Sequence, residues 1–119
     1  MRRSLSFPKS RRLTRASEFE RVRREGRAHH GGLLILGVLA AKQVHGFRAG
    51  FVTARRLGGA AVRNRVRRRL KEIVRLSAAT GLSSGHDYVL IGRRAALSLP
   101  FDQITEDFKR ALRRLRVPK

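Results

Sequence analysis

The most informative segment of the sequence is VRNRVRRRLKEIVRLSAA, residues 62–79. At about 100° per residue, an α-helix gathers four of its apolar side chains into one stripe: Val62, Val66, Leu70 and Ile73. The opposite face is polar and mostly basic, and it holds Asn64, Arg67, Arg68, Lys71 and Arg75. A helix in water normally mixes charges of both signs, because i,i+4 ion pairs stabilise it. This segment forgoes such pairs, so it predicts a helix that packs on a core and presents a basic face to a polyanion.

Apolar runs on both sides of this helix predict the strands of a sheet. The run Leu33–Leu39 is almost continuously apolar, which is typical of a buried strand, and His29–Gly32 before it has the composition of a turn. Phe47–Ala54 alternates apolar with small or polar side chains, and we expect it to pair antiparallel with the strand that precedes it. Tyr88–Ile91 predicts a further buried strand after the helix.

A first helix is predicted near the start of the chain, from about Thr14 or Ser17 to Glu25. Ser17 and Glu20 have the spacing of a capping box, in which two side chains satisfy the free N–H groups at a helix start. Gly26 is expected to end the helix, because glycine adopts the backbone conformations found at helix ends.

A final helix is predicted after Pro100. Its apolar side chains recur at helical spacing and are Phe101, Ile104, Phe108, Leu112 and Leu115. Its acids come early and its basic residues late, which suits the helix dipole. The order helix, strands, helix, strand, helix predicts a small single α+β domain over residues 13–119, with residues 1–12 as a basic N-terminal arm.

The charge of the chain points to a polyanionic partner. Its 119 residues include 29 Lys and Arg but only 8 Asp and Glu, which gives a formal net charge of +21. Solubility needs a net charge of only about 2–8 in magnitude, and a larger charge opposes compaction of the chain. Binding to a membrane surface would need one basic amphipathic helix, whereas the basic residues here are spread over several segments. Nucleic acid is therefore the expected partner.

Several other classes of protein are excluded by composition. The chain has no Cys, so it has neither disulfides nor Cys-based metal sites. No run of 18 apolar residues exists, and the basic N-terminus lacks the apolar run of a signal peptide. Gly58-Gly59 lacks the Lys-Ser/Thr pattern of a phosphate-binding P-loop. We therefore expect a cytoplasmic protein that binds neither a membrane nor a small-molecule cofactor.

Catalysis by side chains of this chain is not expected. Most of the eight acids have basic neighbours in the sequence, so they are expected to balance local charge. His29 and His30 lack a third metal ligand at a suitable spacing, which argues against a metal site. A nuclease that needs no RNA would instead use an acid such as Asp87 or Glu72 together with a metal ion.

One stretch resembles a known family. Residues 55–72, RRLGGAAVRNRVRRRLKE, combine a basic pair, a Gly-containing turn, Arg-Asn-Arg and further basic positions along one helix. This pattern resembles the signature of the bacterial ribonuclease P protein component. The opening Arg12-Leu13 with Glu18-Phe19, and the strand Asp87–Arg93, are also similar to that family.

The resemblance implies a function that composition does not show. The family is the small subunit of ribonuclease P, an endoribonuclease whose catalytic RNA subunit carries the active site and holds most of the Mg²⁺. The holoenzyme hydrolyses one phosphodiester of precursor tRNA, which removes the 5′ leader and leaves the mature 5′ end. The expected partners are therefore ribonuclease P RNA and precursor tRNA. The implied fold has a ribosomal protein S5 domain 2-like sheet with a left-handed crossover around the basic helix, although right-handed crossovers are the general rule.

The resemblance also implies roles for individual residues. The RNA-binding motif matches Arg55, Arg56, Arg63, Asn64, Arg65, Arg67, Arg68 and Lys71. Phe19 matches an aromatic that lines a cleft for the single-stranded leader, between the first helix and the sheet; packing in the core is the alternative role for this ring. The family has further aromatics where Arg23 stands and near Gly37, and we expect their absence to be compensated by Phe47, Phe51 and Tyr88.

Arg69 falls on the apolar stripe of the basic helix, so its long side chain must reach water or contact RNA. A ribosomal or other structural RNA-binding protein would share the size and charge of this chain. The Arg-Asn-Arg helix after a glycine turn favours ribonuclease P, and binding to the two kinds of RNA separates the hypotheses.

Overall fold

The computed structural model describes residues 11–41, 46–79, 82 and 85–117. Its helices and strands are, in order, α1 (Ala16–Glu25), β1 (Arg27–His30), β2 (Leu34–Ala40), β3 (Phe47–Val52), α2 (Ala60–Ala79), β4 (His86–Gly92) and α3 (Phe101–Arg114). Two short 3₁₀ helices, η3 (Arg55–Leu57) and η4 (Arg94–Leu97), follow β3 and β4. All but the last two residues of the predicted arm, 1–12, lie outside the described residues. The predicted α+β order is confirmed, with β1 as an additional strand.

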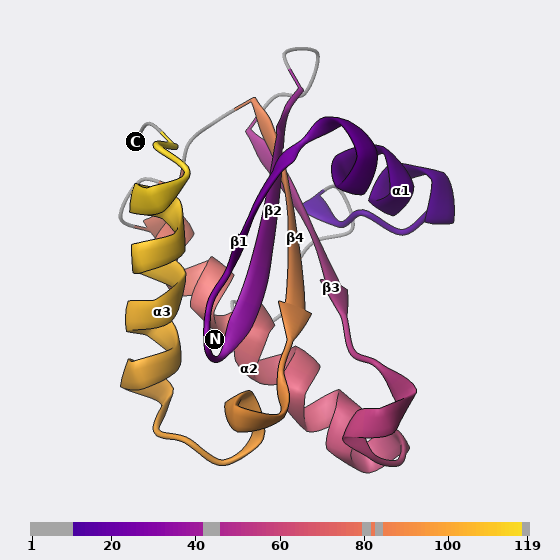
Figure 1. Cartoon of the computed structure of the whole chain (residues 1–119), viewed down its shortest axis with the longest axis vertical. Coiled ribbons are helices and arrows are strands. Elements are labelled where there is room, and N and C mark those ends of the chain that lie inside the picture. Colours follow the sequence, from indigo (N-terminus) through magenta and orange to yellow (C-terminus); the bar gives the residue numbers. More distant parts are fainter. Residues whose placement is uncertain (1–10, 42–45, 80–81, 83–84, 118–119) are drawn as a thin grey trace, which may run out of the picture.

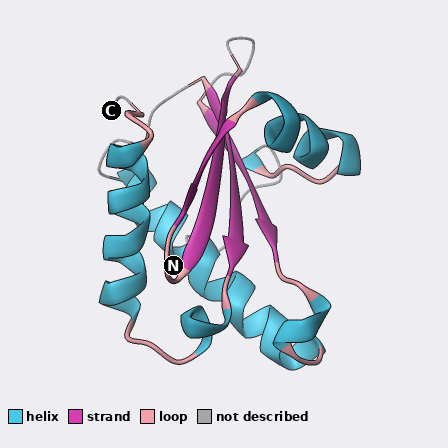
Figure 2. Ribbon diagram, viewed as in Figure 1, coloured by secondary structure: helices cyan, strands magenta, loops and turns pink. Residues whose placement is uncertain are grey.

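The four strands form one mixed sheet in the order β1-β2-β4-β3 (Figure 2). β2 pairs antiparallel with β1 and β4, whereas β3 pairs parallel with β4. The predicted antiparallel pair of β2 and β3 is therefore wrong. β4 lies between them because its continuous apolar run, buried along most of its length, suits a central position with a partner on each side.

The parallel pair requires the chain to cross from the end of β3 to the start of β4, and α2 makes this crossover. Figure 1 shows α2 passing behind the sheet from β3 to β4, and in this arrangement the crossover is left-handed. The left-handed connection implied by the family resemblance is thus present, in place of the general right-handed rule.

The main core lies on the face of the sheet that α2 and α3 cover. Alternate residues of the strands, such as Leu36, Tyr88 and Leu90, are fully buried there against both helices. α2 contributes Val66, Leu70, Ile73 and Val74. α1 packs on the opposite face through a smaller cluster of Leu13, Val22 and Val89. One face of the sheet is therefore fully covered, and the other is covered only in part.

Two local predictions near α1 and β1 are corrected by the structure. The helix is capped by Glu18, whose Oε1 accepts the backbone N–H groups of Thr14 and Arg15 at 3.0 Å each, rather than by Ser17 and Glu20. The His29–Gly32 segment is a turn only in its second half, because both histidines belong to β1. An edge strand with polar side chains lacks the apolar alternation by which a strand is recognised.

No helix in the described ranges is both long and apolar enough to cross a membrane.

Candidate nucleic-acid interface

The predicted basic face of α2 is present on the outside of the fold. Val66, Leu70 and Ile73 are fully buried against the sheet, which turns the remaining positions of the helix outward. Asn64, Arg65 and Arg68 are exposed on this side, whereas Arg63, Arg67 and Lys71 are half-buried. We call these six residues the α2 basic face. At about 100° per residue, Asn64, Arg67, Arg68 and Lys71 lie on the side of the helix opposite the apolar stripe.

The charge of the α2 basic face is not neutralised by acids. In the described part of the chain, Arg75 is the α2 cation that forms an ion pair, with Glu72 at 2.5 Å. The pKa of Lys71 is lowered by burial and by the positive charges of Arg12 and Arg67. Like charges therefore crowd each other here, which an approaching polyanion would relieve.

Arg69 has a structural role that the sequence did not reveal. Its Nη2 donates a hydrogen bond to the backbone carbonyl of Leu99, in the segment between η4 and α3. This contact fastens that segment to α2. The half-buried Arg69 side chain therefore bonds to the protein itself, where water or RNA had been expected.

A second group of cations lies at the N-terminal end of α2. Arg55 and Arg56 are exposed on η3, and the chain turns from η3 into the helix at Gly58, whose φ of 145° is unfavourable for any side chain. Arg94 of η4 donates to the carbonyl oxygen of Arg56 at 3.2 Å. This contact brings the exposed Arg93 and Arg94 beside the predicted basic pair. Sequence reasoning missed them as site residues, although a basic pair directly after a strand was visible.

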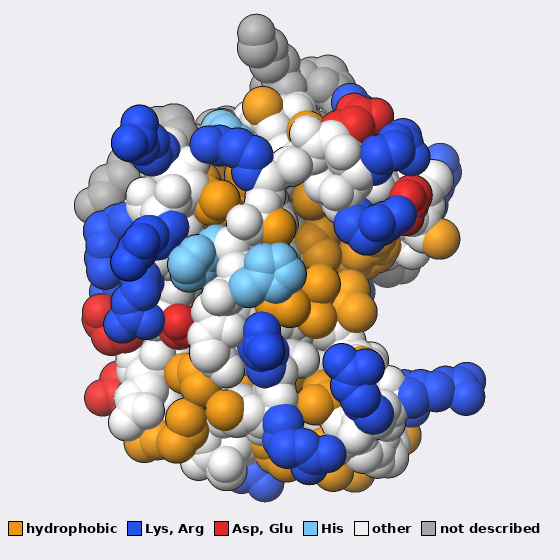
Figure 3. All heavy atoms as spheres, in the orientation of Figure 1, with side chains coloured by type: hydrophobic (Ala, Val, Ile, Leu, Met, Phe, Trp, Pro, Cys, Tyr) orange, Lys and Arg blue, Asp and Glu red, His pale blue; other side chains and the backbone are white. Residues whose placement is uncertain are grey.

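On the other face of the sheet, a cleft of about 700 Å³ separates α1 from the strands. Its floor is apolar and includes Ile35, Gly37, Val52, Val89 and Ile91. Its rim is polar and includes Glu20, Arg23, Arg27 and His30. Figure 3 shows the cleft as a hollow with hydrophobic side chains on its floor and basic side chains at its margins. An apolar floor with charged margins suits a ligand that has flat apolar groups and an anionic backbone.

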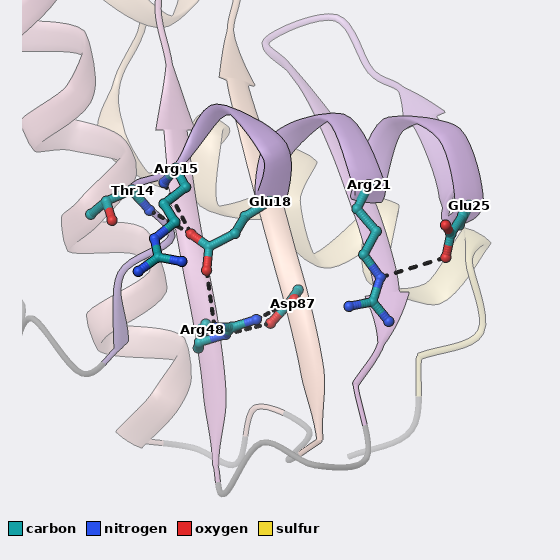
Figure 4. Close-up of polar contacts among 7 residues, drawn as sticks. All are labelled: Thr14, Arg15, Glu18, Arg21, Glu25, Arg48 and Asp87. Atoms are coloured by element: carbon teal, nitrogen blue, oxygen red, sulfur yellow. Dashed lines mark hydrogen bonds and ion pairs between the residues drawn. The ribbon is translucent and has the colours of Figure 1, made fainter.

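An ion-pair network holds α1 above this cleft (Figure 4). Arg48 of β3 donates to both carboxylate oxygens of Asp87 on β4, at 3.0 and 2.9 Å, and to Glu18 of α1 at 3.2 Å. The Asp87 hydrogen bond is the main cause of the raised pKa of Arg48. The pKa of Glu18 is lowered, first by the backbone N–H of Arg15 and also by Arg48. One half-buried arginine thus joins two strands and the first helix.

A family model described as Ribonuclease P matches residues 7–116. The chain belongs to the ribonuclease P protein family.

The chain matches most of the length of its relatives. The "Ribonuclease P protein component" of Chloroflexus aurantiacus is 44% identical over 103 residues, spanning 86% of this chain and 75% of the relative. That of Ruegeria pomeroyi is 38% identical over 109 residues, spanning 90% and 87%. Among solved structures, the RNase P protein of Staphylococcus aureus has a TM-score of 0.78 at 22% identity, covering 92% of this chain and 98% of that one. The RNase P protein from Thermotoga maritima has a TM-score of 0.75 at 24% identity, covering 91% and 98%. These two structures confirm the fold.

The aromatic residues expected in the ribonuclease P leader cleft are not brought together. Phe19 lies in the cleft, with its ring so close above Gly50 that any side chain there would overlap it. Tyr88 and Phe47 are buried in the core on the opposite face, and Phe51 packs against that core. Strand alternation is the reason, because the odd-numbered positions of β3 all face α2 and α3. Those three residues do not line the cleft.

The histidines also separate. His30 lies at the rim of the cleft, whereas His29 is opposite Leu36 in the register and shares the face that α3 covers. Among the described residues, no three His, Asp or Glu side chains are grouped closely enough to hold a metal ion.

Proposed function

We propose that this chain is the protein subunit of ribonuclease P and acts in the cytoplasm. It binds the catalytic RNA subunit through the α2 basic face together with Arg55 and Arg56, and it holds the single-stranded 5′ leader of precursor tRNA in the cleft beside α1. The observation that carries this proposal is the α2 basic face, where several cations lie side by side without a carboxylate partner among the described residues.

The chemistry of the α2 basic face suits an RNA backbone. Arginine presents a planar fork of N–H groups that matches the oxygens of a phosphate, and each phosphate neutralised releases condensed counterions. Asn64 adds an amide, whose NH₂ group can donate to RNA while its Oδ1 accepts a hydrogen bond from Arg67. The surface can therefore bind phosphates and distinguish a local shape of the RNA.

The cleft suits a single strand. Its aliphatic floor and the edge of Phe19 provide a surface for unstacked bases, and Arg27 at the rim provides a cation for the phosphates. With one ring in place of several, stacking contributes less here than apolar contact along the floor. We infer that the leader is bound with little discrimination between bases.

The acids of the chain support a binding role over a catalytic one. Asp87 is engaged by Arg48, Glu72 by Arg75, and Asp107 by the backbone N–H groups of Leu33 and Leu34. We propose that the RNA subunit supplies the catalytic centre and most of the Mg²⁺ sites. The cations of this chain then reduce phosphate repulsion within the complex, which lowers the Mg²⁺ concentration that the RNA requires.

Reconstitution tests this proposal. Precursor tRNA cleavage is measured with the RNA subunit alone, with the protein alone, and with both, over a range of Mg²⁺ concentrations. We expect the complex to release the 5′ leader at Mg²⁺ concentrations where the RNA alone is inactive, and the protein alone to release none. An unchanged Mg²⁺ requirement would contradict the proposal. Cleavage by the protein alone would support a protein-only nuclease, and tighter binding to ribosomal RNA would support a structural RNA-binding protein.

A further inference from the structure

The Arg67 guanidinium is held between two neutral oxygen atoms. Its Nη1 donates to the hydroxyl oxygen of Thr53 at 2.7 Å, and its Nη2 donates to Oδ1 of Asn64. Thr53 directly follows β3, whereas Asn64 lies one turn before Arg67 on α2. No carboxylate pairs with Arg67 within the ranges that the structure describes. The guanidinium is therefore fixed in direction while its full charge is retained.

The half-buried Thr53 directs its methyl group toward Gly92. A Cβ placed on Gly92 would lie 2.5 Å from Cγ1 of Val66 and 3.9 Å from Cγ2 of Thr53. The Thr53 methyl group thus faces the apolar seam between β4 and α2, and the hydroxyl group points toward Arg67. Because a β-branched side chain has few favourable rotamers, this packing leaves the hydroxyl little freedom to turn away.

Arg67 is also part of a converging group of cations. Lys71 lies one turn further along α2, and its lowered pKa reflects, after burial, the charges of Arg12 and Arg67. Arg12 reaches this place from a different segment, which bridges to β3 at Ala49. Cations from two segments of the chain therefore lie near Lys71.

We propose that Thr53 is a positioning residue for RNA binding. Together with Asn64, it orients the Arg67 guanidinium so that the N–H groups not used by these two oxygens face a phosphate of the RNA subunit. An arginine fork held in place before binding loses less side-chain freedom when it meets the phosphate. The same contact turns the Asn64 carbonyl inward, which leaves its NH₂ group as a donor toward RNA. This inference rests on the proposed function of the α2 basic face.

Isosteric substitution tests the role of the hydroxyl group. Thr53→Val keeps the shape and the methyl group but removes the acceptor, whereas Thr53→Ser keeps the acceptor. Affinity for ribonuclease P RNA is measured for each full-length variant at several salt concentrations, and thermal unfolding is followed in parallel. We expect Thr53→Val to weaken binding about three- to tenfold, the range that one lost hydrogen bond produces. Thr53→Ser should stay within about twofold of the parent.

A matched control and a second background separate positioning from general destabilisation. Thr105→Val removes a hydroxyl group that bonds to the Phe101 carbonyl on α3, away from the α2 basic face, and should leave RNA affinity unchanged. In an Arg67→Met background, Thr53→Val should weaken binding no further. The salt dependence should flatten in Arg67→Met, which loses a charge, and not in Thr53→Val, which keeps it.

Three outcomes would overturn the inference. Parent-like binding by Thr53→Val, while Arg67→Met binds weakly, would remove Thr53 from the interface and leave the proposed function intact. An equal loss from Thr53→Val with and without Arg67 would assign the effect to structure in general. Failure of the parent chain itself to bind ribonuclease P RNA would overturn the proposed function and this inference together.

Discussion

At the scale of single residues, Arg48 shows how a buried charge is tolerated in this small domain. The Asp87 carboxylate is only 3% exposed, and its cost of desolvation is offset because Arg48 contacts both of its oxygens. Glu18 completes the arrangement from α1. Nothing in the sequence distance between these three residues indicates that they meet, so the network could not be predicted from the chain alone.

Replacing Arg48 by Met should therefore destabilise the protein strongly. The variant leaves Asp87 buried without a partner, and we expect the free energy of unfolding to fall by about 3 kcal/mol. Arg21→Met is the control, because the Arg21–Glu25 pair is nearly half exposed and spans 3.5 Å, and its loss should cost less than about 1 kcal/mol. Urea denaturation measures both. Equal losses in the two variants would contradict a special role for the buried network.

Glu18 makes part of this stability depend on pH. Its pKa lies below the ordinary value of 4.5 in the folded chain, so protons bind preferentially to the unfolded chain. The stabilisation is therefore fully present above pH 4.5 and is lost as the pH falls through the lower, folded pKa. We expect Glu18→Gln to show a shallower loss of stability between neutral pH and pH values below 4.5, as measured by urea denaturation. Parallel pH curves for parent and variant would be inconsistent with this account.

At the scale of elements, sequence periodicity predicted those segments whose burial is simple. α2, α3 and β2 each bury one regular set of apolar positions, whereas β4 is buried almost continuously, and these patterns identify them. β1 was missed because its sequence, RAHH, is polar at the edge of the sheet. The partner of β3 was wrong because an alternating pattern predicts a strand but does not specify which strand lies beside it.

In the candidate site, too, features within one element could be predicted from the sequence, whereas contacts between distant segments could not. The α2 basic face depends on one helix, so a helical wheel was sufficient to predict it. The contacts of Arg67 with Thr53 and of Arg94 with Arg56 join segments far apart in sequence, and no local pattern contains them. The misplaced cleft aromatics were a different error, since strand alternation already assigns Phe47 and Phe51 to the face opposite Val52.

Asp107 connects two elements by a contact that was not predicted, because the sequence related the early acids of α3 only to the helix dipole. It is 4% exposed, and Oδ2 accepts the N–H groups of Leu33 and Leu34 at 3.0 and 3.2 Å, which ties α3 to the start of β2. Asp107→Ala should lower the free energy of unfolding by about 2–3 kcal/mol, because buried N–H groups lose a charged acceptor. Glu106→Ala is the control, since this side chain is exposed and its pair with Lys109 spans 4.0 Å. Thermal or urea unfolding that ranks the two variants equally would contradict the assigned contact.

At the scale of the whole molecule, the few acids are placed unevenly. With a net charge of +21, the chain cannot neutralise most of its cations. The ion pairs of the described residues lie largely on α1 and α3, where Glu20, Glu25, Glu106 and Asp107 meet neighbouring basic side chains. Even the cleft rim is partly neutralised, because Arg23 pairs with Glu20 at 2.5 Å. Among the described residues, the α2 basic face keeps its cations without a carboxylate partner.

This uneven distribution predicts that the salt dependence of binding is local to α2. Each RNA phosphate neutralised contributes about 0.7–0.9 to the slope of log K against log salt, so Arg65→Ala with Arg68→Ala should flatten the slope for ribonuclease P RNA by about 1.5. Arg113→Ala with Arg114→Ala removes the same charge from exposed positions of α3 and should change the slope by less than about 0.5. Titrations at four or more salt concentrations measure both slopes. Equal flattening in the two double variants would show that net charge, and not the arrangement on α2, determines affinity.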